Sequence, residues 1–184
     1  MAEKFKNGDL IFQTSLSGQS RAIQLATHSK YSHCGLIFKK NGQWLVFEAV
    51  QPVRFTPLEA WAARGLDGKF VVKRLKNADS VLTPAALEKI GATGKSFLGK
   101  NYDTFFGWSD DKIYCSELIW KIYERATGLE LGKLQKLADF DLSSPVVQAK
   151  LRQRYGNNLP QNEPVISPAR IFDSELLTTV FEGG

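Results

Sequence analysis

Short apolar runs separated by turn residues dominate the first half of the chain. The runs are 8–13, 31–38, 44–50 and 70–75. Runs of this length, bounded by glycine, asparagine and other polar residues, are typical of β-strands. Asn41-Gly42 lies between the second and third runs, and this dipeptide favours a two-residue hairpin turn. The pattern therefore predicts a small antiparallel sheet.

Apolar residues at helical spacing predict several helices. Candidate helices begin near residues 21, 56, 83, 115, 144 and 167. In four of them a Thr-Pro or Ser-Pro pair offers an N-cap followed by proline at the first helical position, and Thr56 is one of these predicted N-caps. The elements predict one α+β domain over residues 1–184, with a small antiparallel sheet or half-barrel packed against the helix that begins near Cys115.

The helix that follows Cys115 has an apolar face, which places the cysteine in its first turn. The apolar positions are Leu118, Ile119, Ile122, Tyr123 and Ala126. Ser109, Asp110 and Asp111, just upstream, are residue types that start helices. A thiol at a helix N-terminus is shifted toward the thiolate, the nucleophile of cysteine hydrolases. The alternative is that Cys115 is a small buried apolar residue, the common role of a free cysteine.

A two-residue turn at Asn41-Gly42 also fixes which residues face each other across the hairpin. His33 then lies opposite Val50. Glu48, two residues from Val50, shares the face of His33 and is its diagonal neighbour, within reach of an imidazole. A shift of the register by one residue would move Glu48 to the opposite face.

His33 is the better of two candidate bases for Cys115. Nucleophilic cysteine chemistry needs a base and a group that orients it, and an imidazole held by Glu48 can present its second nitrogen to the thiol. His28 lies in a polar stretch and is the weaker candidate. The alternatives are that His33 is a half-buried structural residue and that Glu48 lies at a solvated strand end. Cys34 follows His33, faces the opposite side of the strand and is interpreted as a packing residue; a disulfide between Cys34 and Cys115 would exclude the nucleophile hypothesis.

Composition excludes several other classes of protein. The 184 residues are 43% hydrophobic and 23% charged, which is typical of a soluble globular chain. The formal net charge of +5 comes from scattered residues, so we expect no nucleic-acid binding and at most weak association with anionic envelope surfaces. Two histidines and two cysteines without ligand spacing predict no metal site, and we expect no cofactor.

The sequence shows no recognisable targeting signal, so the cellular compartment stays open. No run has the continuous apolar length that a membrane helix needs. Residues 1–7 are polar and lack the apolar core of a signal peptide. We therefore expect either a cytoplasmic protein or an exported one whose signal has been removed.

Several motifs follow one another in an order that carries a resemblance. They are Gly8-Asp9-Leu10-Ile11-Phe12, Ala22-Ile23-Gln24, Thr27-His28-Ser29, Tyr31-Ser32-His33-Cys34-Gly35, Phe47-Glu48-Ala49, Gly99-Lys100-Asn101-Tyr102-Asp103, Tyr114-Cys115-Ser116-Glu117 and Asp139-Phe140-Asp141-Leu142-Ser143. In this order the chain resembles the YiiX/YaeF-type permuted papain-like amidases, bacterial relatives of the NlpC/P60 proteins. In the permuted group the histidine precedes the cysteine, as His33 precedes Cys115 here. Asn101 departs from the proline that the resemblance implies before Tyr102.

The resemblance implies a circularly permuted papain-like fold and a cysteine amidase or peptidase that works through a thioester. Cys115 would be the nucleophile, His33 the base and Glu48 the third, polar member. Tyr102 is the candidate for a second oxyanion donor beside the backbone N–H of Cys115. The candidate pocket residues, with ordinary packing as the alternative for each, are Tyr31, Ser32 and Tyr114. The implied substrate is a small peptide, an amino-acid amide or an acyl compound, and the implied compartment is the periplasm or cell envelope.

Two other functions stay open from the sequence. Related permuted folds are similar to lipid acyltransferases, so an acyl hydrolase or acyltransferase is the alternative among enzymes. The same cleft in an inactive protein would make a module that binds an acyl chain, a peptide or a free amino acid. An apolar tunnel beside Cys115 would favour a lipid substrate, whereas a short polar cleft would favour a small polar amide.

Overall fold

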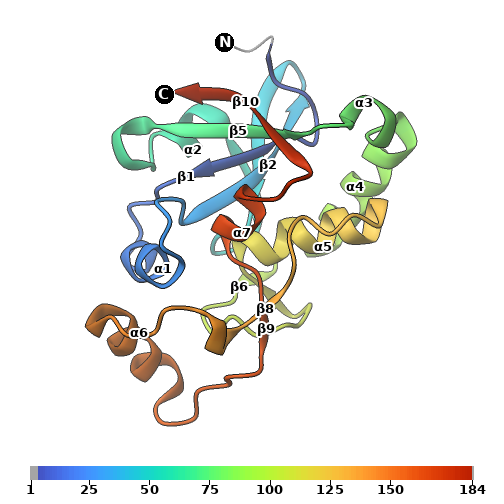
Figure 1. Ribbon diagram of the computed structural model, residues 1–184. Helices are drawn as coiled ribbons and strands as arrows, with labels where there is room; N and C mark the ends of the chain where they lie inside the picture. Colours follow the sequence, from blue (N-terminus) through green and yellow to red (C-terminus); the bar gives the residue numbers. More distant parts are fainter. Residues whose placement is uncertain (1–3, 184) are drawn as a thin grey trace.

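A six-stranded sheet forms the centre of the computed structural model, which describes residues 4–183. The strand order is β10-β5-β1-β2-β3-β4, and every neighbouring pair is antiparallel (Figure 1). The strands are β1 (Leu10–Gln13), β2 (His33–Lys40), β3 (Gln43–Glu48), β4 (Arg54–Pro57), β5 (Phe70–Leu75) and β10 (Leu177–Gly183). The predicted mixed fold with an antiparallel sheet is confirmed, although the sequence pattern did not indicate β4 and β10.

Seven α-helices in the described residues surround the sheet or extend away from it. They are α1 (Ser20–Thr27), α2 (Leu58–Ala62), α3 (Ala78–Val81), α4 (Pro84–Phe97), α5 (Cys115–Thr127), α6 (Pro145–Tyr155) and α7 (Pro168–Phe172). The short elements are β6 (Asn101–Tyr102), β7 (Lys112–Ile113), β8 (Gln135–Lys136), β9 (Pro164–Val165) and the 3-10 turns η2 (Leu66–Gly68) and η3 (Leu137–Asp139). In Figure 1, α6 lies at the end of the molecule away from the six-stranded sheet.

Side chains alternate between the two faces of the sheet and build two apolar cores. The larger core joins Phe12, Leu36 and Phe47 to the apolar face of α5. The smaller core joins Ile11, Ile37 and Val46 to Trp61 of α2. Adjacent strand residues point to opposite faces, so both faces of the central strands are apolar and covered.

The hairpin between β2 and β3 has the predicted register. Lys40 pairs with Gln43 and Leu36 pairs with Phe47. Both turn residues have positive φ, 51° at Asn41 and 79° at Gly42, as the type I′ turn requires. This register is what places Glu48 near His33.

The predicted start of α2 is wrong. Thr56 belongs to β4 rather than capping the helix, and the N-cap position is Pro57, which makes no side-chain cap bond. The Thr56 hydroxyl instead donates to the buried carboxylate of Glu48, at 2.6 Å. A hydrogen bond to a buried charge is stronger than a typical helix cap, which explains the difference.

Within the described part of the chain, no helix combines the length and the apolarity that crossing a membrane requires.

Candidate active site

Cys115 is the first residue of α5 and is almost completely buried, with 3% of its surface exposed. The predicted place of Cys115 in the first helical turn is confirmed, with Tyr114 as the N-cap residue and β7 between the helix and the upstream Ser-Asp-Asp stretch. Asp110 instead pairs with Lys121 and with Arg125. The amides of the first helical turn lack partners within the helix, so Cys115 lies at the positive end of the helix dipole.

His33 and Glu48 meet as the hairpin register predicts. His33 Nε2 lies 2.6 Å from Glu48 Oε2. The carboxylate of Glu48 is fully buried, and its other oxygen accepts hydrogen bonds from the Thr56 hydroxyl and the Arg64 guanidinium. The solvated strand end that was the alternative for Glu48 is therefore excluded.

The contacts of His33 leave its second ring nitrogen for the cysteine. Its imidazole stacks on the indole of Trp61, with centroids 5.8 Å apart and planes 25° from parallel. Because Nε2 faces Glu48, Nδ1 is the ring nitrogen left for the cysteine, and hydrogen bonding with Cys115 is one of the causes that raise the pKa of His33. A carboxylate on one nitrogen fixes which proton the imidazole carries at the other.

The electrostatics of the site favour a thiolate–imidazolium pair. A hydrogen bond from the Cys34 thiol lowers the pKa of Cys115 well below its ordinary value, and His33 lowers it further by hydrogen bonding and by its charge, against the opposing effect of burial. Burial alone would lower the pKa of His33, but the hydrogen bonds and charges of Cys115 and Glu48 raise it to about 9. Burial would raise the pKa of Glu48, yet its bond to His33 holds it below its ordinary value.

Cys34 has a role at the site that the sequence analysis does not assign. It is fully buried in the larger core, as expected of a packing residue. Its thiol nevertheless hydrogen-bonds to Cys115, and burial raises the pKa of Cys34 well above its ordinary value. Cys34 therefore remains a thiol and donates to the thiolate. Both cysteines are free, so the disulfide that would exclude a nucleophilic Cys115 is absent.

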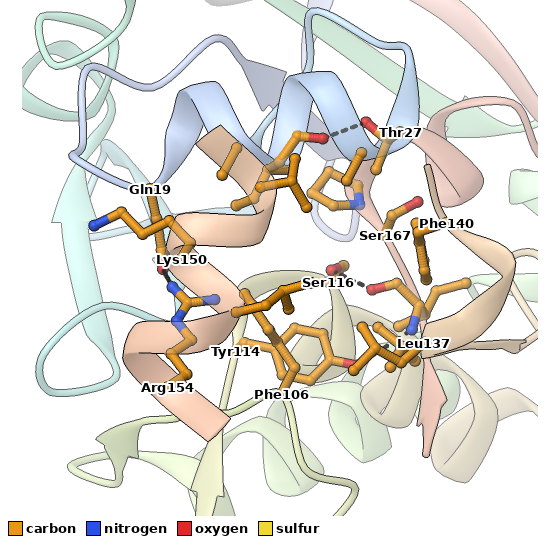
Figure 2. A pocket seen from close by; sticks show the side chains of 18 of the residues that line it. Gln19, Thr27, Phe106, Tyr114, Ser116, Leu137, Phe140, Lys150, Arg154 and Ser167 are labelled. Carbon is orange, nitrogen blue, oxygen red and sulfur yellow. Dashed lines mark hydrogen bonds between the residues drawn. The ribbon is translucent and has the colours of Figure 1, made fainter. Parts of the chain in front are cut away.

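A largely apolar cavity lies between α1 and α6 (Figure 2). Its apolar lining comes from Ala22, Ile23, Ala26, Phe106, Leu137, Phe140, Leu142, Val147, Leu151, Val165, Ile166 and Pro168. Its polar lining includes Gln19, Tyr102, Lys150 and Arg154. Cys115 is itself one of the residues that line this cavity, whereas His33, Cys34 and Glu48 are not.

Both the order of the site residues and the fold agree with one family of known proteins. A sequence model described as the permuted papain-like amidase enzyme, YaeF/YiiX, C92 family, matches residues 4–181. The chain belongs to the C92 family of permuted papain-like amidases.

Two relatives show how closely the chain follows this C92 family. The uncharacterized protein YiiX of Escherichia coli (strain K12) is 53% identical over 175 residues, which are 95% of this chain and 85% of that protein. The crystal structure of a protein described as metalloprotein yiiX from Escherichia coli O157:H7 is similar with a TM-score of 0.92 and 51% identity, over 97% of this chain and 98% of that chain. The permuted papain-like fold that the resemblance implied is therefore confirmed.

The resemblance implied four further residues for the oxyanion site and the pocket, and only two of these four line the cavity. Tyr102 and Tyr114 line the cavity. Ser32 does not line it, and its hydroxyl is bonded to Ser20 at 2.6 Å. Tyr31 also lies outside the lining and stacks on Phe172, with centroids 4.1 Å apart. The packing alternative thus describes Ser32 and Tyr31.

His28, the weaker base candidate, makes its contacts outside the group formed by Cys115, His33 and Glu48. It follows α1 at an exposed position and lies 3.0 Å from Asp141. Its ring makes no contact with Cys115, whose hydrogen-bonding partners are Cys34 and His33.

Several residues at the site were missed from the sequence. Thr56 and Arg64 bind Glu48. Gln19 donates to the Tyr102 hydroxyl at 2.8 Å and accepts from Arg154 at 2.8 Å. The sequence signal available for Thr56 was its place opposite β3, but the Thr-Pro pair is equally typical of a helix start.

Proposed function

We propose that this protein is a cysteine hydrolase that cleaves an amide bond, with Cys115 as nucleophile, His33 as general base and acid, and Glu48 as the group that orients His33. One observation carries the proposal: the imidazole of His33 is held by buried Glu48 through Nε2, and the interaction of His33 with Cys115 raises the pKa of the histidine and lowers that of the cysteine. This is the sequence of contacts that an activated thiol nucleophile requires.

The reaction follows from these contacts in two halves. In the first, the Cys115 thiolate attacks the amide carbon, and the protonated ring of His33 gives its proton to the leaving nitrogen as the C–N bond breaks. In the second, His33 takes a proton from water, the resulting hydroxide attacks the thioester, and the acid leaves as the thiolate is restored. Glu48 stabilises the imidazolium in both halves.

Two donors are placed to bind the oxyanion that forms in each half. The backbone N–H of Cys115 is at the start of α5, where amides have no partner within the helix. The Tyr102 hydroxyl accepts its hydrogen bond from Gln19 Nε2, which leaves the hydroxyl proton for another acceptor. Donors fixed before the reaction stabilise such charge most effectively.

The apolar cavity supports a second candidate function, the hydrolysis or transfer of acyl esters or thioesters. Its mostly apolar lining supports a lipid substrate over a small polar amide. The same Cys115–His33–Glu48 chemistry serves an ester, because only the leaving atom changes. The two candidates therefore differ in substrate and not in catalytic residues.

The proposed mechanism contains no metal step. The Escherichia coli O157:H7 relative is described as a metalloprotein, but among residues 4–183 no group of three or more histidine, cysteine, aspartate or glutamate side chains is placed to hold a metal ion. Protein zinc sites use at least three such ligands, so the described residues do not form a zinc site of that kind.

The decisive test is the capture of an acyl group on Cys115. The protein would be mixed with p-nitrophenyl acetate, and intact and peptide masses would be measured. We expect one acetyl group on Cys115, no adduct in Cys115→Ala, and slower formation in His33→Ala, with His28→Ala, a change at the exposed histidine beside Asp141, as the control. An adduct that survives Cys115→Ala would overturn the proposal. Turnover of the matched p-nitroacetanilide, an amide, would favour the amidase over the esterase.

A further inference from the structure

Three side chains from distant parts of the chain form one hydrogen-bonded row at the cavity. Gln19 lies just before α1, Tyr102 lies in β6 and Arg154 lies in the last turn of α6. Arg154 donates to Gln19 Oε1 at 2.8 Å, and Gln19 Nε2 donates to the Tyr102 hydroxyl oxygen at 2.8 Å. All three line the cavity together with Cys115, and Figure 2 shows Gln19 and Arg154 against each other. The row therefore joins α6 to the residue that we assign as an oxyanion donor.

The chemistry of Arg154 fixes the direction of each bond in this row. A guanidinium has donors and no acceptor, so the Gln19 atom that faces Arg154 is the amide oxygen. The amide nitrogen of Gln19 then faces Tyr102, and this nitrogen can only donate. The oxygen of Tyr102 therefore accepts, and its proton remains available to a third group.

The Tyr102 proton has no competing acceptor in the described part of the chain. Among residues 4–183, the bond from Gln19 is the one hydrogen bond that the Tyr102 hydroxyl makes. Burial and then the charge of Cys115 raise the pKa of Tyr102 well above its ordinary value, so the hydroxyl keeps its proton at neutral pH. A hydroxyl held in this way can donate to the carbonyl oxygen as negative charge moves there from the sulfur.

The side chain of Gln19 serves Tyr102 rather than its own helix. Gln19 is the N-cap residue of α1, yet its side chain makes no capping bond. The two ends of a side-chain amide are nearly equal in shape, so packing alone does not choose between them. Arg154 makes that choice, and its guanidinium is itself held 4.7 Å from the centre of the Phe106 ring.

We propose that Gln19 and Arg154 are positioning residues for the oxyanion site: Arg154 orients the Gln19 amide, and the amide turns the Tyr102 proton toward the carbonyl oxygen of the substrate. The inference rests on the proposed function, since the oxyanion forms when Cys115 attacks a carbonyl carbon. Both residues act through Tyr102, so their effects on the reaction vanish when the Tyr102 hydroxyl is removed.

Two reagents that react with Cys115 separate the oxyanion site from the nucleophile. Acetylation by p-nitrophenyl acetate passes through a tetrahedral oxyanion, whereas alkylation by iodoacetamide displaces iodide at a saturated carbon and forms no oxyanion. Both rates would be measured on the full chain, with peptide masses identifying Cys115. A change in the ratio of the two rates reports on the oxyanion site, whereas loss of the fold or of the thiolate slows both reactions.

Substitutions at Gln19 give a rank order that shape alone would reverse. Gln19→Glu keeps the size of the side chain, but its carboxylate accepts the Tyr102 proton, so we expect acetylation to slow by about 10²-fold, as in Tyr102→Phe. Gln19→Leu leaves the hydroxyl free to rotate, and a loss of about 10-fold is expected. Alkylation should change far less in each variant. Gln153→Glu adds the same charge at an exposed position of α6 and, as the control, should react like the wild type.

Combined variants test whether both residues act through Tyr102. In the Tyr102→Phe background, Gln19→Glu is expected to cause no further loss of acetylation rate, because the proton that it would misdirect is absent. Arg154→Met should slow acetylation by about 5-fold, less than the loss of the donor itself, and should also have no effect in Tyr102→Phe. Arg152→Met, at an exposed position of the same helix, is the control.

The outcomes distinguish this inference from the proposed function. Faster acetylation in Gln19→Glu than in Gln19→Leu, or losses that multiply in the double variants, would overturn the inference, while acetylation of wild-type Cys115 leaves the proposed function standing. An unchanged acetylation rate in Arg154→Met would overturn the role of Arg154. Failure of wild-type Cys115 to become acetylated would overturn both the proposed function and the inference.

Discussion

The two sides of Cys115 differ in how completely their polar groups are paired. On the sheet side, both carboxylate oxygens of Glu48 have donors and the ring of His33 is held between Glu48 and Cys115. On the cavity side, α1 presents half-buried apolar side chains, and Arg154 contacts the neutral Gln19 amide and the Phe106 ring. The first region is complete within the protein, whereas the second has surface and charge that a ligand would cover.

This difference separates chemistry from recognition. In the proposed mechanism, the preorganised groups at the sheet side would lower the barrier of a reaction at Cys115, because they need no rearrangement when charge develops. The apolar surface and the cation of Arg154 at the cavity side would decide which molecule reaches the sulfur. Variants on the two sides should therefore have different kinetic effects, and the predictions below use this contrast.

The largest effect is expected for His33→Ala. Loss of the base should lower kcat/KM by between about 10²- and 10⁴-fold, with KM changed little because the ring does not line the cavity. Steady-state kinetics on p-nitrophenyl acetate would measure it, with thermal unfolding to confirm the fold and His33→Gln as a second variant that keeps more of the packing on Trp61. A variant with near wild-type kcat/KM would contradict the assignment of the base.

Glu48→Gln should have the next largest effect, about 10²-fold in kcat/KM, since an orienting carboxylate contributes less than the nucleophile or the base. The amide keeps an oxygen for Thr56 but no longer carries the charge that stabilises the imidazolium. Because Glu48 raises the pKa of His33, the loss of activity at alkaline pH should begin at a lower pH than in the wild type. A pH profile that does not move would assign Glu48 a purely structural role.

The sequence predicts the core of the site but not its surroundings, for a physical reason. Asn41-Gly42 fixes the hairpin register locally, so the meeting of His33 and Glu48 follows from neighbours along the chain. Thr56 was misassigned because a Thr-Pro pair caps helices as readily as it ends a strand. The cavity joins α1, β6, α5 and α6, and no local pattern encodes how such distant segments pack.

Thr56→Val tests the support of Glu48 with a smaller effect. The hydroxyl donates to the buried carboxylate at 2.6 Å, and a hydrogen bond to a charged group contributes about 1.5–3 kcal/mol to stability. We expect a lower free energy of unfolding by that amount and about a 10-fold loss of kcat/KM, from chemical denaturation and kinetics. Thr56→Ser keeps the hydroxyl and should retain most of both.

The smallest effect on the chemistry itself is expected for Arg154→Met. This substitution lies on the cavity side, so the rate at which iodoacetamide labels Cys115 should stay within about 2-fold of the wild type while selectivity among amides changes. If Arg154→Met slows labelling as strongly as His33→Ala does, the proposed separation between chemistry and recognition is wrong.

The pH dependence of Cys115 labelling by iodoacetamide tests the central claim most directly, with peptide masses distinguishing Cys115 from buried Cys34. The pKa of Cys115 lies well below its ordinary value and that of His33 is raised to about 9, so the ion pair exists between them. Labelling should reach its plateau at a lower pH than an ordinary cysteine allows and fall only as acid protonates the sulfur. Amide hydrolysis should decline as pH rises through about 9, where His33 loses the proton that the leaving nitrogen needs. His33→Ala should shift the labelling midpoint upward. A wild-type midpoint at the ordinary pKa of a cysteine, unchanged in His33→Ala, would contradict the account.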